Sequence, residues 1–284
     1  MTSPKRKRSG IMLAKPFEER YLEKWPKRFL VQPKIDGLRC RAKIERGKVE
    51  LFSSTSLPIN SVPHIVSELA ALSECLHNPW ELDGELSTPD FDFQRTCSIV
   101  KRNDVHPEHK DINFHIFDIV SKNTQLQRMK WLDSIIPIDN PDLIRVDTFL
   151  SDSFQDAMEF LSTFMVFGYE GIIFRHPNGS YEAKRSSYLL KLKPQKSDEY
   201  RIIGYQEEID KYGIPKDSLG AFICTKDSLE FSVGTGPALT KAGREKLWVN
   251  RKDLPGKILV VKYQNLTRDR QVPRCPVALE VKDV

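Results

Sequence analysis

Apolar and polar residues alternate most clearly between Leu38 and Glu45, where every second side chain is apolar. This period of two predicts a β-strand with one face in water and the other in a core. The turn-forming pair Asp36-Gly37 separates this segment from an apolar run at Phe29–Pro33, which we expect to be a strand as well. Arg46-Gly47 is a second turn, and Val49–Ser53 is expected to return as the hairpin partner.

Helical spacing of apolar residues appears in two places. Proline is typical of the first turn of a helix, and apolar residues recur on one side between Ile65 and Leu72 after Pro63. A second helix is predicted from Ser151 to Phe167, with Gly168 as its cap. Its apolar positions, which we expect in a core rather than around a cofactor, are Phe154, Met158, Leu161 and Met165.

The composition changes near Lys196–Glu199, and short strands with turn signals follow. Several short strands and one helix suit a small β-barrel of the OB type. The expected strands are Arg201–Gln206, Gly220–Thr225, Leu229–Val233 and Lys257–Tyr263, and the expected helix is Thr240–Trp248. The fold class is therefore α+β in three parts: a basic flexible tail at 1–10, a domain of antiparallel sheets with helices at 11–197, and the barrel at 198–284.

Composition excludes several classes of protein. The 284 residues, 39% hydrophobic and 29% charged, suffice for one large or two smaller globular domains with a core. No apolar run approaches the roughly 18 residues of a membrane span, and the first ten residues lack the apolar segment of a secretory signal. The five cysteines form no CxxC pair, which argues against a disulfide framework or a zinc site. We expect a cytoplasmic protein without a membrane partner.

The net charge of +5 is unevenly distributed. Lys5–Arg8 supplies four of these charges, and this run is a nuclear address, an arm on nucleic-acid phosphates or a solvated end. The rest of the chain is nearly neutral, so a polyanion must be bound through local clusters. The segment 175–196 is the clearest such cluster, because it holds six basic residues against the single acid Glu182.

The strongest candidate for chemistry is Lys34, in the sequence Lys-Ile-Asp-Gly-Leu-Arg that ends at Arg39. A lysine between the end of a strand and a tight turn is held in place. Its amine becomes a nucleophile when neighbouring cations or a metal ion lower its pKa. The alternative interpretation of this motif is a hairpin with a solvated lysine, and the motif alone does not favour either.

Carboxylates occur in two further motifs. Glu81–Leu86 places three of them around Gly84, and a polar loop with a glycine turn is the favoured interpretation of this segment. Asp118 lies inside the apolar run Phe114–Val120, which we expect to be a buried strand. Because burying a lone carboxylate is costly, Asp118 must be paired or belong to a site. In the same run, His115 is expected to be a satisfied histidine rather than a ligand.

A pair of lysines forms the last motif. In a strand, Lys191 and Lys193 point the same way, and their ammonium groups repel unless an anion such as a triphosphate lies between them. The alternative interpretation of this pair is a strand face in solvent, and the motif alone does not favour either. The motif Glu170-Gly171-Ile-Ile-Phe precedes this pair.

Taken in order, these motifs resemble those of the covalent nucleotidyltransferases: ATP-dependent DNA ligases, RNA ligases and mRNA capping enzymes. The resemblance spans most of residues 29–197 and is closest to the minimal two-domain DNA ligases of viruses, phages and bacteria. It implies an ATP-grasp-like nucleotidyltransferase (adenylation) domain followed by an OB-fold domain. It also implies a monomer that uses ATP and Mg²⁺ or Mn²⁺ to seal nicked duplex DNA.

The resemblance also implies residue roles. Lys34 would attack the α-phosphorus of ATP to form lysyl-AMP, and AMP would then pass to the 5′-phosphate of a nick before the 3′-hydroxyl attacks. The residues expected to bind ATP or AMP are Gln32, Lys34, Arg39, Glu85, Phe117, Glu170, Lys191 and Lys193. The metal would be held by Asp36, Glu85 and Glu170. The expected DNA contacts are Arg39, Arg41, Ser53, Arg185 and Arg274, with Asp118, Lys282 and Asp283 in support.

The sequence departs from the family pattern at three places. Ser53-Ser54 stands where relatives often have Ser-Arg, so that phosphate contact is missing or supplied elsewhere, by Arg41 for example. A C-terminal Arg-x-Asp-Lys type motif is reduced to Lys282-Asp283. The segment Gln206–Ser218 is too short for the DNA-encircling insertion of some viral ligases, which predicts weaker and more salt-dependent DNA binding.

Three alternatives remain open at the level of sequence. A capping guanylyltransferase usually has Asp-Gly where this chain has Glu170-Gly171, and it uses GTP. An RNA ligase uses ATP but seals RNA. A nucleic-acid-binding module with a relic site would have lost a core position, and none of the motif residues is missing.

Overall fold

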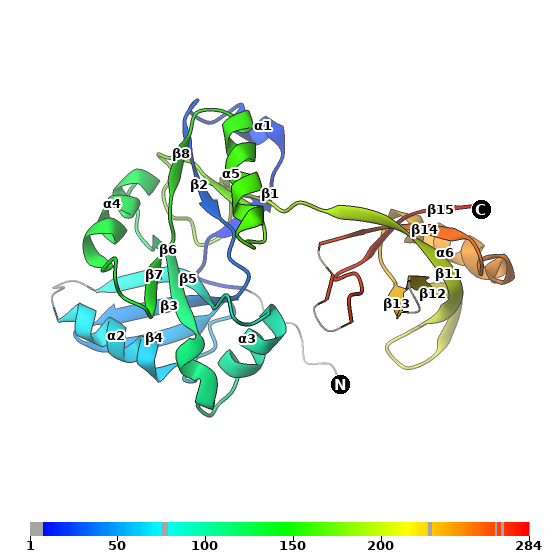
Figure 1. Ribbon diagram of the computed structural model, residues 1–284, viewed down its shortest axis with the longest axis horizontal. Coiled ribbons are helices and arrows are strands. Elements are labelled where there is room, and N and C mark those ends of the chain that lie inside the picture. The colour runs from blue at the N-terminus through cyan, green and yellow to red at the C-terminus, as the bar shows by residue number, and fades with distance from the viewer. Residues whose placement is uncertain (1–7, 75–78, 227–228, 265, 268–269, 284) are drawn as a thin grey trace. The chain divides into compact units, whose positions relative to one another are not determined.

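The structure is a computed structural model that describes residues 8–74, 79–226, 229–264, 266–267 and 270–283 (Figure 1). The chain divides into two compact units between Lys193 and Pro194. Of the predicted flexible tail, residues 1–7 lie outside the described residues. The described end of that segment is bound to the first unit, since the Ser9 amide donates to the Ser54 carbonyl (3.2 Å).

One five-stranded sheet of the first unit carries the first and the last of the sequence motifs, because Lys34 follows one of its strands and Lys193 follows another. In spatial order its strands are β1 (Leu13–Pro16), β10 (Arg185–Leu192), β9 (Ile172–Arg175), β2 (Phe29–Pro33) and β8 (Phe149–Ser151). Only the pairing of β1 with β10 is parallel among these described strands. Helix α1 (Glu19–Leu22) lies between β1 and β2 in the chain.

Helix α5 (Phe154–Val166) packs against β2 and β9 and buries Ala157 and Phe164. The predicted end at Gly168 is confirmed, since this glycine has φ +83° and its amide donates to the Met165 carbonyl. The predicted start at Ser151 is wrong. That residue belongs to β8, and the helix begins after Ser153, whose hydroxyl accepts a hydrogen bond from the Asp156 amide (3.1 Å) and caps the first turn.

A second five-stranded sheet follows the order β4 (Lys48–Ser53), β3 (Leu38–Glu45), β5 (Trp80–Ser87), β6 (Asn113–Ile119) and β7 (Leu143–Arg145). The alternation that predicted β3 is confirmed, because Cys40, Ala42 and Ile44 are buried in the core. Helices α2 (Pro63–Ser73), α3 (Phe93–Val100) and α4 (Gln125–Ile135) contact strands of this sheet.

Strand β5 corrects the prediction of a polar loop at Glu81–Leu86. This segment is an inner strand of the sheet, paired with β3 on one side and β6 on the other. Gly84 does not form a turn. Instead it lets β6 approach closely, because a Cβ on Gly84 would lie 2.4 Å from the His115 carbonyl oxygen.

The second unit contains an antiparallel sheet in the order β13 (Leu229–Val233), β12 (Pro215–Lys226), β11 (Lys196–Ile209), β14 (Ile258–Tyr263) and β15 (Val277–Lys282). Helix α6 (Lys241–Val249) contacts β12, and the last strand was not predicted. The two edges of the sheet are linked where the Ala278 amide donates to the Thr235 carbonyl (2.7 Å). Such closure is typical of small barrels.

The segment 206–218 is a short β-hairpin between β11 and β12. Its turn is closed by the Asp210 carboxylate, which accepts hydrogen bonds from the amides of Tyr212 (2.7 Å) and Ile214 (2.9 Å). The hairpin therefore leaves no room for a long insertion at this place.

None of the helices within the described ranges combines the length and the apolar character that a bilayer crossing requires.

Candidate active site

Strand pairing places Lys34 beside Glu170. Strand β2 is antiparallel to β9, with Pro33 opposite Ile172. The pairing extends beyond both strands, because the Lys34 amide donates to the Gly171 carbonyl (2.9 Å) and the Glu170 amide donates to the Lys34 carbonyl (3.0 Å). The Lys34 ammonium donates directly to the Glu170 carboxylate, so two residues that are far apart in sequence form one ion pair.

Lys193 reaches the same carboxylate from the end of β10. Its ammonium donates to the other oxygen of Glu170. Gly171 makes this approach possible, because its φ is +154° and a Cβ there would lie 2.2 Å from the Leu192 carbonyl oxygen. We call Lys34, Glu170 and Lys193 the lysine–glutamate cluster.

The cluster carries an excess of positive charge. Burial alone would raise the pKa of Glu170, but Lys34 and Lys193 together lower it, so this residue is a carboxylate. Lys191 is half-buried nearby, and burial together with the charges of Lys193 and Lys34 lowers its pKa. The two ammonium groups on Glu170, with that of Lys191 close to them, favour the binding of an anion.

Glu85 lies on β5, directly opposite Arg39 of β3. Burial raises the pKa of Glu85 to about 7; Arg39 and Lys34 oppose this shift, and Asp83 and Glu170 add to it. Within the described residues, no hydrogen bond reaches the Glu85 carboxylate. This acid is therefore available to a ligand close to the lysine–glutamate cluster.

The carboxylates of the site could supply only some of the ligands of a metal ion. No group of three or more His, Cys, Asp or Glu residues is arranged as a metal site in the described part of the chain. Mg²⁺, however, is usually held by one or two carboxylates, with substrate phosphates and water as further ligands. Glu85 and Glu170 fit such a partial donor set. Asp36, the third predicted ligand, lies in the connection to β3, where its carbonyl accepts from the Ser87 hydroxyl (3.1 Å).

Arg39 is held rigidly next to Phe117. Its guanidinium donates two hydrogen bonds to the buried Asp83 carboxylate, Nε to Oδ1 (2.6 Å) and Nη2 to Oδ2 (2.5 Å). The guanidinium lies 4.7 Å from the centre of the Phe117 ring, and that of Arg175 lies 5.4 Å away. Only 19% of the Arg39 side chain is exposed, so it faces the site rather than open solvent.

Asp118 is paired, as expected for a carboxylate in an apolar strand. It accepts hydrogen bonds from Arg128 Nε (2.7 Å) and Arg175 Nη1 (2.6 Å), and these ion pairs lower its pKa despite burial. Arg175 is 3% exposed, so its inclusion in the predicted polyanion-binding segment 175–196 is wrong. The sequence analysis missed Arg128, although it stands four residues before the apolar Leu132 and so shares the buried face of α4.

Gln32 is also part of this interior network. Its side-chain amide nitrogen donates to the Thr148 hydroxyl (2.7 Å), and its oxygen accepts from Arg175 Nε (2.5 Å). The side chain is 1% exposed. Its observed partners are therefore internal, and recognition of a nucleobase edge stays a prediction.

The predicted phosphate contacts differ in how available they are. Arg41 is mostly buried and donates to Glu81 (2.5 Å) and to the Gly10 carbonyl (3.1 Å). The Ser53 hydroxyl accepts from the Leu57 amide (3.1 Å) within the β4 turn. Arg185 is exposed and uses one nitrogen on the Ala14 carbonyl (2.7 Å), which leaves the rest of its guanidinium accessible.

Three predicted residues belong to the second unit. Arg274 is half-buried near the end of the chain. Lys282 forms an ion pair with Glu199 (2.8 Å), and Asp283 forms one with Lys257 (2.6 Å). Both ion pairs lie within the second unit.

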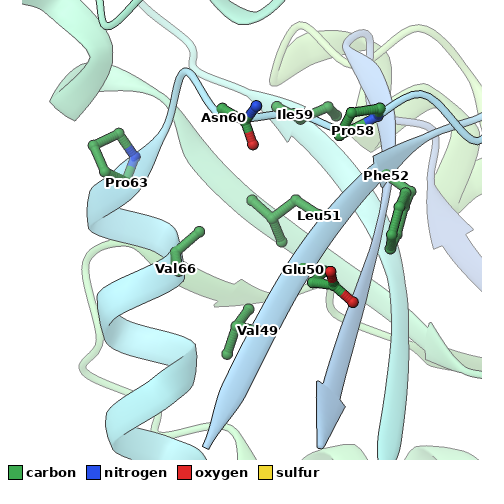
Figure 2. A pocket seen from close by; sticks show the side chains of 9 residues that line it. All are labelled: Val49, Glu50, Leu51, Phe52, Pro58, Ile59, Asn60, Pro63 and Val66. Atoms are coloured by element: carbon green, nitrogen blue, oxygen red, sulfur yellow. The ribbon is translucent and has the colours of Figure 1, made fainter.

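A pocket of about 310 Å³ lies elsewhere in the first unit, between β4 and α2 (Figure 2). Figure 2 shows apolar side chains of Val49, Leu51 and Val66 along it, with Glu50 as its charged residue. None of its lining residues is a predicted site residue, and nothing in its lining matches a nucleotide.

Comparison with known proteins assigns the family. Residues 11–193 match the family model described as "ATP dependent DNA ligase domain", and residues 212–282 match that described as "DNA ligase OB-like domain". The chain belongs to the ATP-dependent DNA ligase family. The α+β fold and the OB-like second domain expected from sequence are thereby confirmed, together with the resemblance.

Two curated DNA ligases are similar to this family member over most of its length. The DNA ligase of African swine fever virus (isolate Pig/Kenya/KEN-50/1950) is 29% identical over 265 residues, which cover 86% of this chain and 61% of the viral protein. The DNA ligase of Haemophilus influenzae is 23% identical over 264 residues, covering 91% of this chain and 87% of that protein. The chain thus spans about three fifths of the viral ligases.

A solved structure described as "DNA binding with a minimal scaffold: Structure-function analysis of Lig E DNA ligases" has the same fold. It superposes with a TM-score of 0.73 at 24% identity, covering 96% of this chain and 99% of the other. This likeness concerns the fold of the ligase family.

Proposed function

We propose that this chain is an ATP-dependent DNA ligase that seals nicks in duplex DNA through a lysyl-AMP intermediate. The lysine–glutamate cluster supports this proposal most directly. It places the Lys34 amine, the Lys193 ammonium and the Glu170 carboxylate at the ends of β2, β10 and β9, and Lys191 lies within β10. Such a group of charges suits phosphoryl chemistry, in which negative charge builds up on oxygen.

In the first step, Lys34 Nζ attacks the α-phosphorus of ATP. A phosphorus–nitrogen bond forms, the bond to the β-phosphate oxygen breaks, and pyrophosphate leaves. The ammonium must lose a proton before its lone pair can attack, and the Glu170 carboxylate accepts a hydrogen bond from that group. Lys191 and Lys193 would stabilise the charge on the phosphoryl oxygens.

The nucleotide and its metal ion would occupy the space around this cluster. Phe117 would stack on adenine, Gln32 would contribute to its recognition, and Arg39 would contact a phosphate. Mg²⁺ or Mn²⁺ would be held by Glu85 and Glu170 with help from Asp36; when bound, it supplies charge neutralisation on the phosphates.

In the later steps, AMP passes from Lys34 to the 5′-phosphate at the nick, and the 3′-hydroxyl then attacks that phosphate and releases AMP. Arg185 is the best placed DNA contact, because its guanidinium is exposed. Arg41 and Ser53 would act by holding the loop after β4, and Arg274 would contact DNA from the second unit. Asp118 supports the site by holding Arg175. Lys282 and Asp283 would have a supporting role in the second unit, where each forms an ion pair.

The broader assignments remain part of the same proposal. Residues 11–197 would form the adenylation domain, residues 198–284 the OB-fold domain, and residues 1–10 a basic tail. The protein would act as a monomer in the cytoplasm, or in a nucleus if the basic run is an address.

A paired assay tests the function. With Mg²⁺ and labelled ATP or GTP, we expect label on the protein from ATP only, and we expect sealing of a nicked DNA duplex. Label from GTP would indicate a guanylyltransferase, and sealing of RNA alone would indicate an RNA ligase. Lys34→Ala should abolish both labelling and sealing. No reaction by the unmodified chain would favour a nucleic-acid-binding module.

A further inference from the structure

Tyr181 lies at the junction of the hydrogen bonds that hold Arg39. It belongs to the connection between β9 and β10, and its hydroxyl donates to Asp83 Oδ2 (2.6 Å). The same hydroxyl accepts a hydrogen bond from the Met12 amide (2.9 Å). A single side chain thereby connects the second sheet to the segment that enters β1.

These contacts close a ring of hydrogen bonds. Asp83 accepts from Arg39 through both oxygens, and Arg39 Nη2 also donates to the Met12 carbonyl (3.0 Å). Met12 therefore uses its carbonyl on Arg39 and its amide on Tyr181. Each of the four members holds its two neighbours, and Asp83 is 1% exposed, so solvent cannot easily replace a missing partner.

The ring of Tyr181 contacts the other network beside Phe117. The Arg128 guanidinium lies 5.9 Å from the centre of the Tyr181 ring. Arg128 holds Asp118, which in turn holds Arg175, and both Arg175 and Arg39 lie over Phe117. Tyr181 thus contacts both networks of guanidinium groups around that aromatic ring.

We propose that Tyr181 is a positioning residue, which acts through Asp83 to fix the direction of the Arg39 guanidinium at the nucleotide and DNA site. The inference rests on the proposed ligase function, in which Arg39 contacts a phosphate. Among the described residues, the hydrogen bonds of the Tyr181 hydroxyl go to Asp83 and Met12 and not to the lysine–glutamate cluster. The Tyr181 hydroxyl matters because it keeps the Arg39 guanidinium in one direction. A guanidinium that is free to turn would have to be reoriented in the transition state, whereas a fixed one is already in place.

The test is single-turnover sealing of a nicked duplex by the full chain carrying preformed lysyl-AMP. Tyr181→Phe should reduce the rate about tenfold or more, since a small misplacement of a positioned group is enough for such a loss. Tyr188→Phe is the matched control, because the Tyr188 hydroxyl makes no hydrogen bond to the described residues. It should keep the unmodified rate.

A double-mutant comparison separates positioning from a general loss of structure. If Tyr181 acts through Arg39, then Tyr181→Phe should cause no further loss in an Arg39→Lys background, because the direction of the fork no longer matters there. A double variant whose loss is the product of the two single losses would overturn the inference. So would a Tyr181→Phe rate within twofold of the unmodified chain.

Thermal melting shows whether the variants fold. Should Tyr181→Phe not fold, Asp83→Asn tests the same link, since the amide keeps the size of the carboxylate but offers one oxygen; it should show the same dependence on Arg39. An unmodified chain that forms no lysyl-AMP contradicts the proposed function. An active chain indifferent to Tyr181→Phe contradicts only the role of Tyr181.

Discussion

At the scale of single residues, the environment of each carboxylate decides what it can do. Glu170 is kept ionised by two lysines, and Asp118 is kept ionised by two arginines. Glu85 is partly buried and has no hydrogen-bond partner among the described residues. The same chemical group therefore serves as the centre of a cluster, as interior support and as an open ligand.

Glu85 predicts how stability depends on pH. Its pKa is about 7 in the folded chain and about 4.5 in the unfolded chain, so the folded state favours the neutral acid. Its contribution to stability is present below the unfolded pKa and is lost as pH rises from about 4.5 to 7. Glu85→Gln should remove this loss. Between pH 4.5 and 7, the free energy of unfolding of this variant should rise by up to about 3 kcal/mol relative to that of the unmodified chain.

Urea unfolding at several pH values measures this difference. A free-energy difference between Glu85→Gln and the unmodified chain that stays constant between pH 4.5 and 7 would show that burial does not perturb this carboxyl.

Arg128 predicts a large stability effect from an interior ion pair. Arg128→Leu leaves Asp118 with Arg175 as its remaining guanidinium partner and should lower the free energy of unfolding by about 3 kcal/mol. Arg102→Leu is the control, because its pair with Asp104 is exposed and should contribute nothing measurable. Denaturant titration of the two variants compares them, and equal stabilities would argue against the interior network.

At the scale of elements, the site depends on how closely the ends of β9 and β10 approach. Gly171→Ala would place a Cβ 2.2 Å from the Leu192 carbonyl oxygen and push Lys193 away from Glu170. We expect lysyl-AMP formation to fall about 100-fold, as for other misplaced reacting groups. Gly47→Ala is the control, since Gly47 has φ +78° but no atom within 4 Å.

Both variants place a Cβ on a residue with a positive φ, but only Gly171→Ala also creates a close approach to another part of the chain. Rates of labelling with ATP provide the comparison, and a Gly171→Ala rate equal to that of Gly47→Ala would contradict the importance of this contact.

Sequence predicted those elements whose signal is local. The alternation of β3 is local because its apolar face enters the core, although its polar face reaches solvent only at Lys43 and Glu45. Helix α5 ends where Gly168 supplies a positive φ. Strand β5 was missed because it is an inner strand, whose aspartate and glycine suggest a turn in isolation. Asp83 can be buried there only because Arg39 and Tyr181 pair with it, and a pairing between residues so distant in sequence has no local signature.

For the site, too, the sequence predicted the residues with a local signal and missed the partners that come from distant parts of the chain. The motif resemblance selected Lys34, Glu170 and Lys193, and strand pairing does bring them together. It did not indicate that Arg41 and Gln32 have interior partners, because their neighbours come from other strands and loops.

At the scale of the whole molecule, we expect charge and the short β11–β12 hairpin to determine how strongly the proposed ligase binds DNA. The net charge of +5 is small and depends largely on Lys5–Arg8, so phosphates must be bound through local clusters of basic residues. We expect the dissociation constant for a nicked duplex to rise at least about tenfold between roughly 50 and 200 mM salt. Fluorescence anisotropy with a labelled nick measures it, and an affinity that is nearly independent of salt would contradict this.

The proposed function requires that Lys34 becomes covalently bonded to AMP. Intact-mass spectrometry after incubation with ATP and Mg²⁺, followed by peptide mapping, detects this bond. We predict a single added adenylate on the peptide that contains Lys34, lost on addition of pyrophosphate and missing in Lys34→Ala. An unmodified mass, or an adduct on another lysine, would show that Lys34 is not the nucleophile.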